Sequence, residues 1–180
     1  MAIKTNSAVS PLIRMVLLAL ITLISLCACN QEQNRPAPKF TLQLFDTIDH
    51  ASMQTRNFPN DTSKVSVVNF WFPSCPPCIS EMPEINKFYL EHRERVEVIA
   101  VQLVGLDSVE AGQQFVTANN IAFAVGADLN GKITTDYKVS VFPSTFFIST
   151  SGDITKVWQG KITADEIKEI VTPMITRQEG

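Results

Sequence analysis

The chain has 180 residues, of which 45% are hydrophobic and 18% charged, with a formal net charge of −3. This composition predicts one globular domain with a short extension. The sequence has no basic run beyond His92–Arg93–Glu94–Arg95, so a nucleic-acid partner is not expected.

The first 29 residues have the features of an export signal. Lys4 and Arg14 precede an uncharged apolar block over residues 15–26, which is shorter than the roughly 20 residues that a membrane-spanning helix needs. The block ends in Leu26–Cys27–Ala28–Cys29, which resembles the lipobox of bacterial lipoproteins. The resemblance implies a lipid anchor on Cys29 and export to the bacterial periplasm or the outer face of the membrane. Plain signal cleavage and an uncleaved anchor are the alternatives.

This export signal separates the four cysteines of the chain. Cys27 would leave with the signal and Cys29 would carry lipid, so Cys75 and Cys78 would be the pair left in the exported domain. In an oxidising compartment, such a close-spaced pair favours redox chemistry over a structural bridge.

The remaining chain predicts a tether followed by an α/β domain. Residues 30–38 are polar and contain prolines, which predicts a flexible tether, and the domain covers residues 39–180. Alternating or continuous apolar runs predict strands over 40–45, 65–72, 96–103, 122–125, 145–148 and 154–158, with a possible further strand between 46 and 61.

Helices are predicted between these strands. Their expected positions are 79–91 with Pro83 inside, a segment capped by Asp107 with Glu110, 133–137, and a segment capped by Thr163 with Glu166 that Pro173 kinks or ends early. The element order predicts a mixed central sheet with helices on both faces.

The segment Cys75–Pro76–Pro77–Cys78 lies where the second predicted strand gives way to a helix. The first N–H groups of a helix and its dipole favour a thiolate there, which predicts a thiol–disulfide exchange centre. Neither proline has an N–H, so the Cys78 amide is the main donor left for a Cys75 thiolate. A less stabilised thiolate predicts a more reducing couple, and therefore a reductase rather than an oxidase.

Three motifs together resemble the TlpA/ResA-like branch of the thioredoxin fold, a family of membrane-anchored bacterial thiol–disulfide oxidoreductases. They are Asn69–Phe70–Trp71 before the cysteine pair, Glu81–Met82–Pro83 after it, and the distant Val141–Phe142–Pro143–Ser144–Thr145–Phe146. The resemblance implies a thioredoxin fold with an N-terminal β extension and a central helical insertion over residues 105–120. Ser74 departs from the family, which commonly has Trp there.

Cys75 is expected to be the more exposed thiol and the nucleophile, with Cys78 as the resolving thiol. Thioredoxin has a buried Asp where this chain has Asn69, which cannot take a proton, so the proton acceptor and donor is expected at Glu81. A solvated helix carboxylate is the alternative for Glu81. The resemblance further implies a substrate-binding set with a cis bond before Pro143, consisting of Trp71, Pro76, Pro77, Phe142 and Pro143.

The expected partners follow from the same resemblance. They are a disulfide-containing protein substrate, with cytochrome c maturation as one candidate process, and a membrane thiol donor such as a DsbD/CcdA-like protein. We expect a monomer with no cofactor beyond the redox-active Cys75–Cys78 disulfide, and no metal. A disulfide-forming oxidase, a reductase of peroxides, and a Cu(I) carrier that uses both cysteines and Met82 remain alternatives.

Overall fold

The computed structural model describes residues 35–58 and 63–176. The predicted signal segment, its Cys29 and the first part of the predicted tether lie outside these ranges. Within them, no helix has both the length and the apolar character that crossing a bilayer requires.

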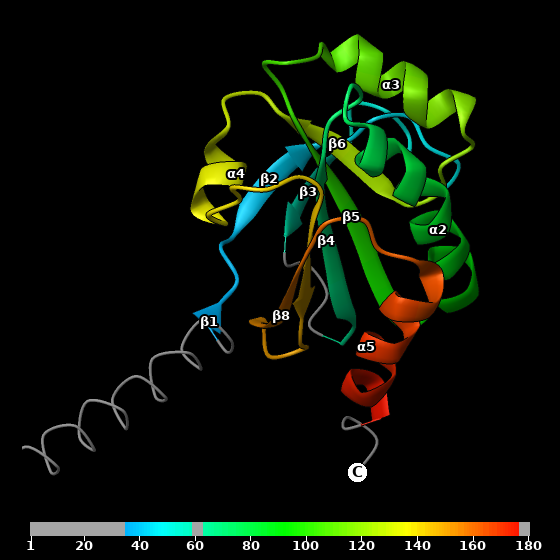
Figure 1. The fold of residues 1–180 in the computed structure, drawn as a ribbon, viewed down its shortest axis with the longest axis vertical. Coiled ribbons are helices and arrows are strands. Elements are labelled where there is room, and N and C mark those ends of the chain that lie inside the picture. Colours follow the sequence, from blue (N-terminus) through cyan, green and yellow to red (C-terminus); the bar gives the residue numbers. More distant parts are fainter. Residues whose placement is uncertain (1–34, 59–62, 177–180) are drawn as a thin grey trace, which may run out of the picture. The chain divides into compact units, whose positions relative to one another are not determined.

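A six-stranded mixed sheet forms the centre of the domain, in the order β1-β8-β7-β4-β5-β6 (Figure 1). Its strands are β1 (Arg35–Pro36), β4 (Val65–Trp71), β5 (Val96–Leu103), β6 (Ala124–Asp128), β7 (Ser144–Ile148) and β8 (Asp153–Gln159). Strands β4, β5 and β6 run parallel, whereas β7 is antiparallel to both β4 and β8. A separate antiparallel pair consists of β2 (Phe40–Gln43) and β3 (Thr55–Phe58). The predicted mixed sheet is confirmed.

In the described part of the chain, four helices accompany the sheet: α2 (Pro76–His92), α3 (Val109–Ala118), α4 (Lys132–Asp136) and α5 (Ala164–Thr176). In Figure 1, α2 and α5 lie to the right of the sheet, and α4 lies with β2 to the left. Each side has its own buried cluster of apolar side chains. The predicted covering of both faces is therefore confirmed.

Strand β4 contributes side chains to both clusters. Val67 and Trp71 belong to the cluster under α2 and α5, whereas Val68 and Phe70 belong to the opposite one. Because successive side chains of a strand point to opposite faces, Asn69 lies on the α2 side. This alternation places a polar residue of the central strand under the helix that begins with the cysteine pair.

Helix α5 starts with the predicted capping box. The backbone N–H and hydroxyl of Thr163 donate to Oε2 of Glu166 at 2.8 and 2.7 Å, and the Glu166 N–H donates to the Thr163 hydroxyl at 3.3 Å. The helix continues through Pro173 to Thr176, so the predicted early end is wrong. Its apolar stripe, which includes the buried Val171, packs into the core. Burial of that stripe compensates for the one hydrogen bond that a proline removes.

The start of α3 and the bounds of β6 also differ from the prediction. Ser108, not Asp107, caps α3, and its side chain accepts a hydrogen bond from the Ala111 N–H at 3.2 Å. Strand β6 begins at Ala124 rather than Ala122, because the Ala122 carbonyl accepts hydrogen bonds from the loop after β2 instead of from a strand.

The ordered domain begins before residue 39. Arg35 and Pro36 pair with Ile154 and Asp153 of β8, and the Ala37 N–H donates to the Gly152 carbonyl at 2.8 Å. This part of the predicted tether is therefore a short edge strand. An edge position tolerates Pro36 because one side of an edge strand needs no donors.

Candidate active site

Cys75 and Cys78 form a disulfide at the start of α2, just beyond the end of β4. Cys75 is the N-cap residue of the helix, and its sulfur accepts a hydrogen bond from the Cys78 N–H at 3.3 Å. The Cys78 N–H is the donor expected for the Cys75 sulfur, because Pro76 and Pro77 have no N–H. Cys75 is 5% exposed and Cys78 is fully buried, so Cys75 is the sulfur that a partner can reach.

Glu81 lies one helical turn beyond Cys78 and is fully buried, so the alternative of a solvated carboxylate is wrong. Its Oε1 accepts from the Asn69 side-chain amide at 2.7 Å, and its Oε2 accepts from the Ile162 N–H at 2.9 Å. Burial raises the pKa of Glu81 to about 7, against the opposing effects of these two donors and of the Lys161 charge. A carboxyl with this pKa can both take and give a proton at neutral pH.

Asn69 connects this carboxyl to the neighbouring strand. Its Nδ2 also lies 3.1 Å from the Thr145 hydroxyl, and the two residues are register partners on β4 and β7. The sequence reasoning did not assign Asn69, Thr145 or Ile162 to the site. One feature could have indicated Asn69: it is a polar residue within an apolar, buried strand.

The loop before β7 carries the third motif, which contacts the loop before the cysteine pair. The Phe142–Pro143 bond is cis, as the resemblance implied. The Phe142 ring meets the Phe72 ring edge-on, with centroids 5.3 Å apart, and Phe72 belongs to the loop that leads to Cys75. The Pro143 carbonyl accepts from the Gly160 N–H at 2.8 Å. Phe72 and Phe142 therefore meet at the buried cluster that includes Cys75 and Cys78.

The remaining residues of the predicted substrate-binding set divide into two kinds. Pro76 and Pro77 are exposed at the first turn of α2. Trp71 is fully buried, and its contact with a substrate stays a prediction. Its ring packs against Phe115 of α3, with centroids 5.2 Å apart. Trp71 therefore joins the end of β4, next to the active-site loop, to α3.

Ser74, the residue in front of the nucleophile, is joined to the loop between β5 and α3. Its backbone N–H and its hydroxyl both donate to Oδ2 of Asp107, at 3.0 and 2.8 Å. The sequence reasoning assigned Asp107 to a helix cap and missed this contact. Nothing in the local sequence indicates it, because the two residues are 33 positions apart.

The described residues contain no group of three or more His, Cys, Asp or Glu side chains that could hold a metal ion. The sulfurs of Cys75 and Cys78 are bonded to each other, so a soft metal could bind them only after reduction. Met82, the expected third ligand of a Cu(I) carrier, is fully buried in the core beneath α2.

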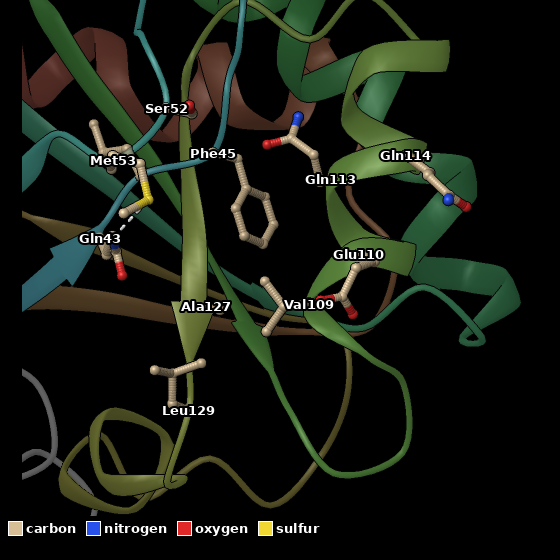
Figure 2. Close-up of a pocket in the computed structure, with 11 residues that line it drawn as sticks. Gln43, Phe45, Ser52, Met53, Val109, Glu110, Gln113, Gln114, Ala127 and Leu129 are labelled. Carbon is tan, nitrogen blue, oxygen red and sulfur yellow. Dashed lines mark hydrogen bonds between the residues drawn. The ribbon is translucent and has the colours of Figure 1, made fainter.

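A separate apolar pocket of about 410 Å³ lies between α3, β6 and the segment after β2 (Figure 2). Figure 2 shows the Phe45 ring projecting into it towards α3. Its lining residues are Gln43, Leu44, Phe45, Ser52, Met53, Val109, Glu110, Gln113, Gln114, Ala127 and Leu129. Neither cysteine is among them, so this pocket does not hold the reacting atoms.

Comparisons with known proteins agree with this geometry. A family model described as the AhpC/TSA family matches residues 34–157. The chain is 33% identical over 144 residues to the thiol-disulfide oxidoreductase ResA of Oceanobacillus iheyensis, covering 79% of this chain and 72% of that protein. It is 29% identical over 144 residues to the sporulation thiol-disulfide oxidoreductase A of Bacillus subtilis, covering 79% and 84%. The crystal structure of StoA from Bacillus subtilis matches with a TM-score of 0.64 and 26% identity, over 74% of this chain and 96% of that one.

Proposed function

The chain belongs to the AhpC/TSA family and is a thiol–disulfide oxidoreductase, and on that premise we propose that it reduces disulfides of other proteins. The observation that carries the proposal is the Cys75–Cys78 disulfide at the N-terminus of α2, with the Phe142–Pro143 loop beside it. An exchangeable pair at a protein surface fits a protein substrate.

The proposed reaction starts from the dithiol. The Cys75 thiolate attacks one sulfur of the partner's disulfide, which forms a mixed disulfide and releases the partner's other sulfur as a thiolate. The Cys78 thiolate then attacks the Cys75 sulfur, closes the Cys75–Cys78 disulfide and releases the reduced partner. Two electrons pass to the partner, and a dithiol donor must return them. We propose a membrane dithiol protein of the DsbD/CcdA kind for that step.

Glu81 is the proposed proton acceptor for Cys78 and the donor on the return path. Its carboxyl is buried one turn from Cys78, and its pKa of about 7 lets it change protonation at little cost near neutral pH. The two donors from Asn69 and Ile162 hold it in place.

The direction of electron flow follows from the donors around Cys75. The Cys78 N–H is the donor to the Cys75 sulfur in the first turn of α2, where two prolines supply none. A thiolate with few donors is weakly stabilised, so the reduced form is a good electron donor. This supports a reductase over a disulfide-forming oxidase.

The proposed location is outside the cytoplasm, with lipid on Cys29 as the anchor. The basic residues, the short apolar block and the small residue before Cys29 support it. Apocytochrome c, whose haem-binding cysteines must be reduced, is one candidate substrate class, and the domain is proposed to act as a monomer.

A trapping experiment tests the function. Cys78→Ser in the full chain should accumulate a mixed disulfide between Cys75 and its substrate, whereas the matched Cys75→Ser variant should accumulate none. The wild type should reduce insulin with dithiothreitol as donor, and both variants should be inactive. A reduction potential near that of DsbA, about −120 mV, would contradict the direction, and stoichiometric Cu(I) binding without insulin reduction would favour the metal carrier.

A further inference from the structure

Asp107 contacts the residue that directly precedes the nucleophile. Both polar hydrogens of Ser74, on its backbone nitrogen and its hydroxyl, point to one carboxylate oxygen of Asp107, at 3.0 and 2.8 Å. Asp107 lies in the loop between β5 and α3, directly before Ser108, which caps α3. The contact therefore ties the inserted helix to the active-site loop.

The charge of Asp107 is not neutralised by its partners. Its two partners here are the backbone N–H and the hydroxyl of Ser74, and both are neutral donors. Within residues 35–58 and 63–176, no Lys, Arg or His forms an ion pair with it. The Asp107 carboxylate is half-buried and lies within hydrogen-bond distance of the residue that directly precedes Cys75.

The same contact withholds donors from Cys75. The Ser74 N–H and hydroxyl, which precede Cys75 in the chain, are both directed to Asp107, and the Cys75 N–H donates to the Phe72 carbonyl at 3.1 Å. On the other side, Pro76 and Pro77 supply none, and the Cys78 N–H is the donor in that turn. Glu81, one turn beyond Cys78, is buried in α2, and the Lys161 charge acts on it.

We propose that Asp107 is a positioning and specificity-determining residue for the disulfide exchange: it fixes the loop before Cys75 and makes the site select disulfides that carry positive charge beside their sulfur atoms. This inference rests on the proposed function, because it concerns the partner that Cys75 attacks. A cationic group next to the partner's disulfide is attracted to the Asp107 carboxylate, whereas an anionic group is repelled.

Two small disulfides of opposite charge test the proposal. Cystamine carries two positive charges, and oxidised glutathione is anionic. The reduced full chain is mixed with each at pH 7 and low salt, and the second-order rate is followed by tryptophan fluorescence. The ratio of the two rates cancels any change in the intrinsic nucleophilicity of Cys75. The cystamine/glutathione ratio should be about three- to tenfold higher in the wild type than in Asp107→Asn, a size expected for one partly screened charge.

Two control variants test whether the rate ratio depends on the charge at position 107 and not on a loss of negative charge elsewhere. Asp153→Asn makes the same charge change at an aspartate that also accepts from a serine hydroxyl, Ser151 at 2.7 Å. Asp153 is the first residue of β8, directly after the turn at the other end of β7 from Pro143. Asp153→Asn and the charge-conserving Asp107→Glu should both keep the wild-type ratio. The wild-type ratio should also fall as salt rises to 0.5 M, a measurement that needs no variant to fold.

Three results would overturn the proposal: an unchanged ratio in folded Asp107→Asn, an equal change in Asp153→Asn, or a wild-type ratio that does not respond to salt. Failure of the proposed function gives a different result. A wild type that exchanges with both small disulfides but does not reduce insulin would contradict the function, and the rate ratio would still test the role of Asp107.

Discussion

Nδ2 of Asn69 lies 2.7 Å from Oε1 of Glu81, and this bond joins the central strand β4 to the helix that carries both cysteines. The same amide nitrogen also contacts the Thr145 hydroxyl on β7. The buried carboxyl is thereby held by β4 through Asn69 and by the loop before α5 through the Ile162 N–H.

We predict that Glu81→Gln removes the pH dependence of the resolving step. In the wild type, the rate at which Cys78 displaces the reduced partner should rise with pH through about 7, where Glu81 ionises and can accept a proton. Glutamine cannot, so the variant should be roughly a hundredfold slower at pH 8 without an inflection near 7. Single-turnover rates from pH 5.5 to 8.5 give the profile.

Glu84→Gln is the matched control for that experiment. Glu84 lies on the same helix and accepts from the Ala164 N–H at 3.2 Å, but it is only partly buried. Its variant should keep the wild-type inflection, and equal profiles for the two variants would rule out a specific role for Glu81.

The pKa of Glu81 also predicts how stability changes with pH. The folded state holds the proton up to about pH 7, whereas the unfolded chain loses it near 4.5. Between these values the folded state binds more protons, so the free energy of unfolding should fall as pH rises, by about 3 kcal/mol in total. Urea unfolding of the oxidised wild type and Glu81→Gln at pH 4.5 to 8 measures the difference. If the difference in unfolding free energy between the wild type and the variant does not change with pH, the raised pKa of Glu81 is contradicted.

We expect Asn69→Ala to raise the pKa of Glu81 further. The variant removes a donor that favours the ionised carboxylate, so the inflection of the pH–rate profile should move above its wild-type position. It should also lower the free energy of unfolding by about 1–3 kcal/mol. Asn86→Ala is the control: its side chain bonds Asn120 and Ala122, so it should lose stability while the inflection stays in place.

The two prolines should differ in their effect on the redox equilibrium. An N-cap side chain accepts from the second or third helical N–H, and Pro77 occupies the second position. Pro77→Ala should therefore add a donor to the Cys75 thiolate and favour the dithiol about three- to tenfold in equilibrium with glutathione. Pro76→Ala, at the first position, should change it little. If Pro76→Ala shifts the equilibrium as far as Pro77→Ala, the effect is not due to that N–H.

Much of the fold could be predicted from local sequence. The apolar run of β4, the hairpin of β7 and β8, and the capping box of Thr163 with Glu166 are each encoded within a few residues, and the structure confirms them. The errors concern positions where a distant contact competes with a local preference. Asp107 has a helix-capping composition, but its carboxylate is taken by Ser74. Arg35 and Pro36 look like a tether until β8 pairs with them.

The cysteine pair shows the same division between local and distant information. Its spacing, its two prolines and its place between a strand and a helix predict thiol–disulfide chemistry from the sequence alone, because helix N-termini act on the nearest residues. Only the tertiary structure decides which groups surround the pair. Asn69, Asp107, Pro143 and Ile162 come from four different segments, and their contacts depend on strand register and on how the loops pack, which local sequence does not specify. The sequence thus determined the nucleophile, and the fold determined the charges and proton acceptors that act on it.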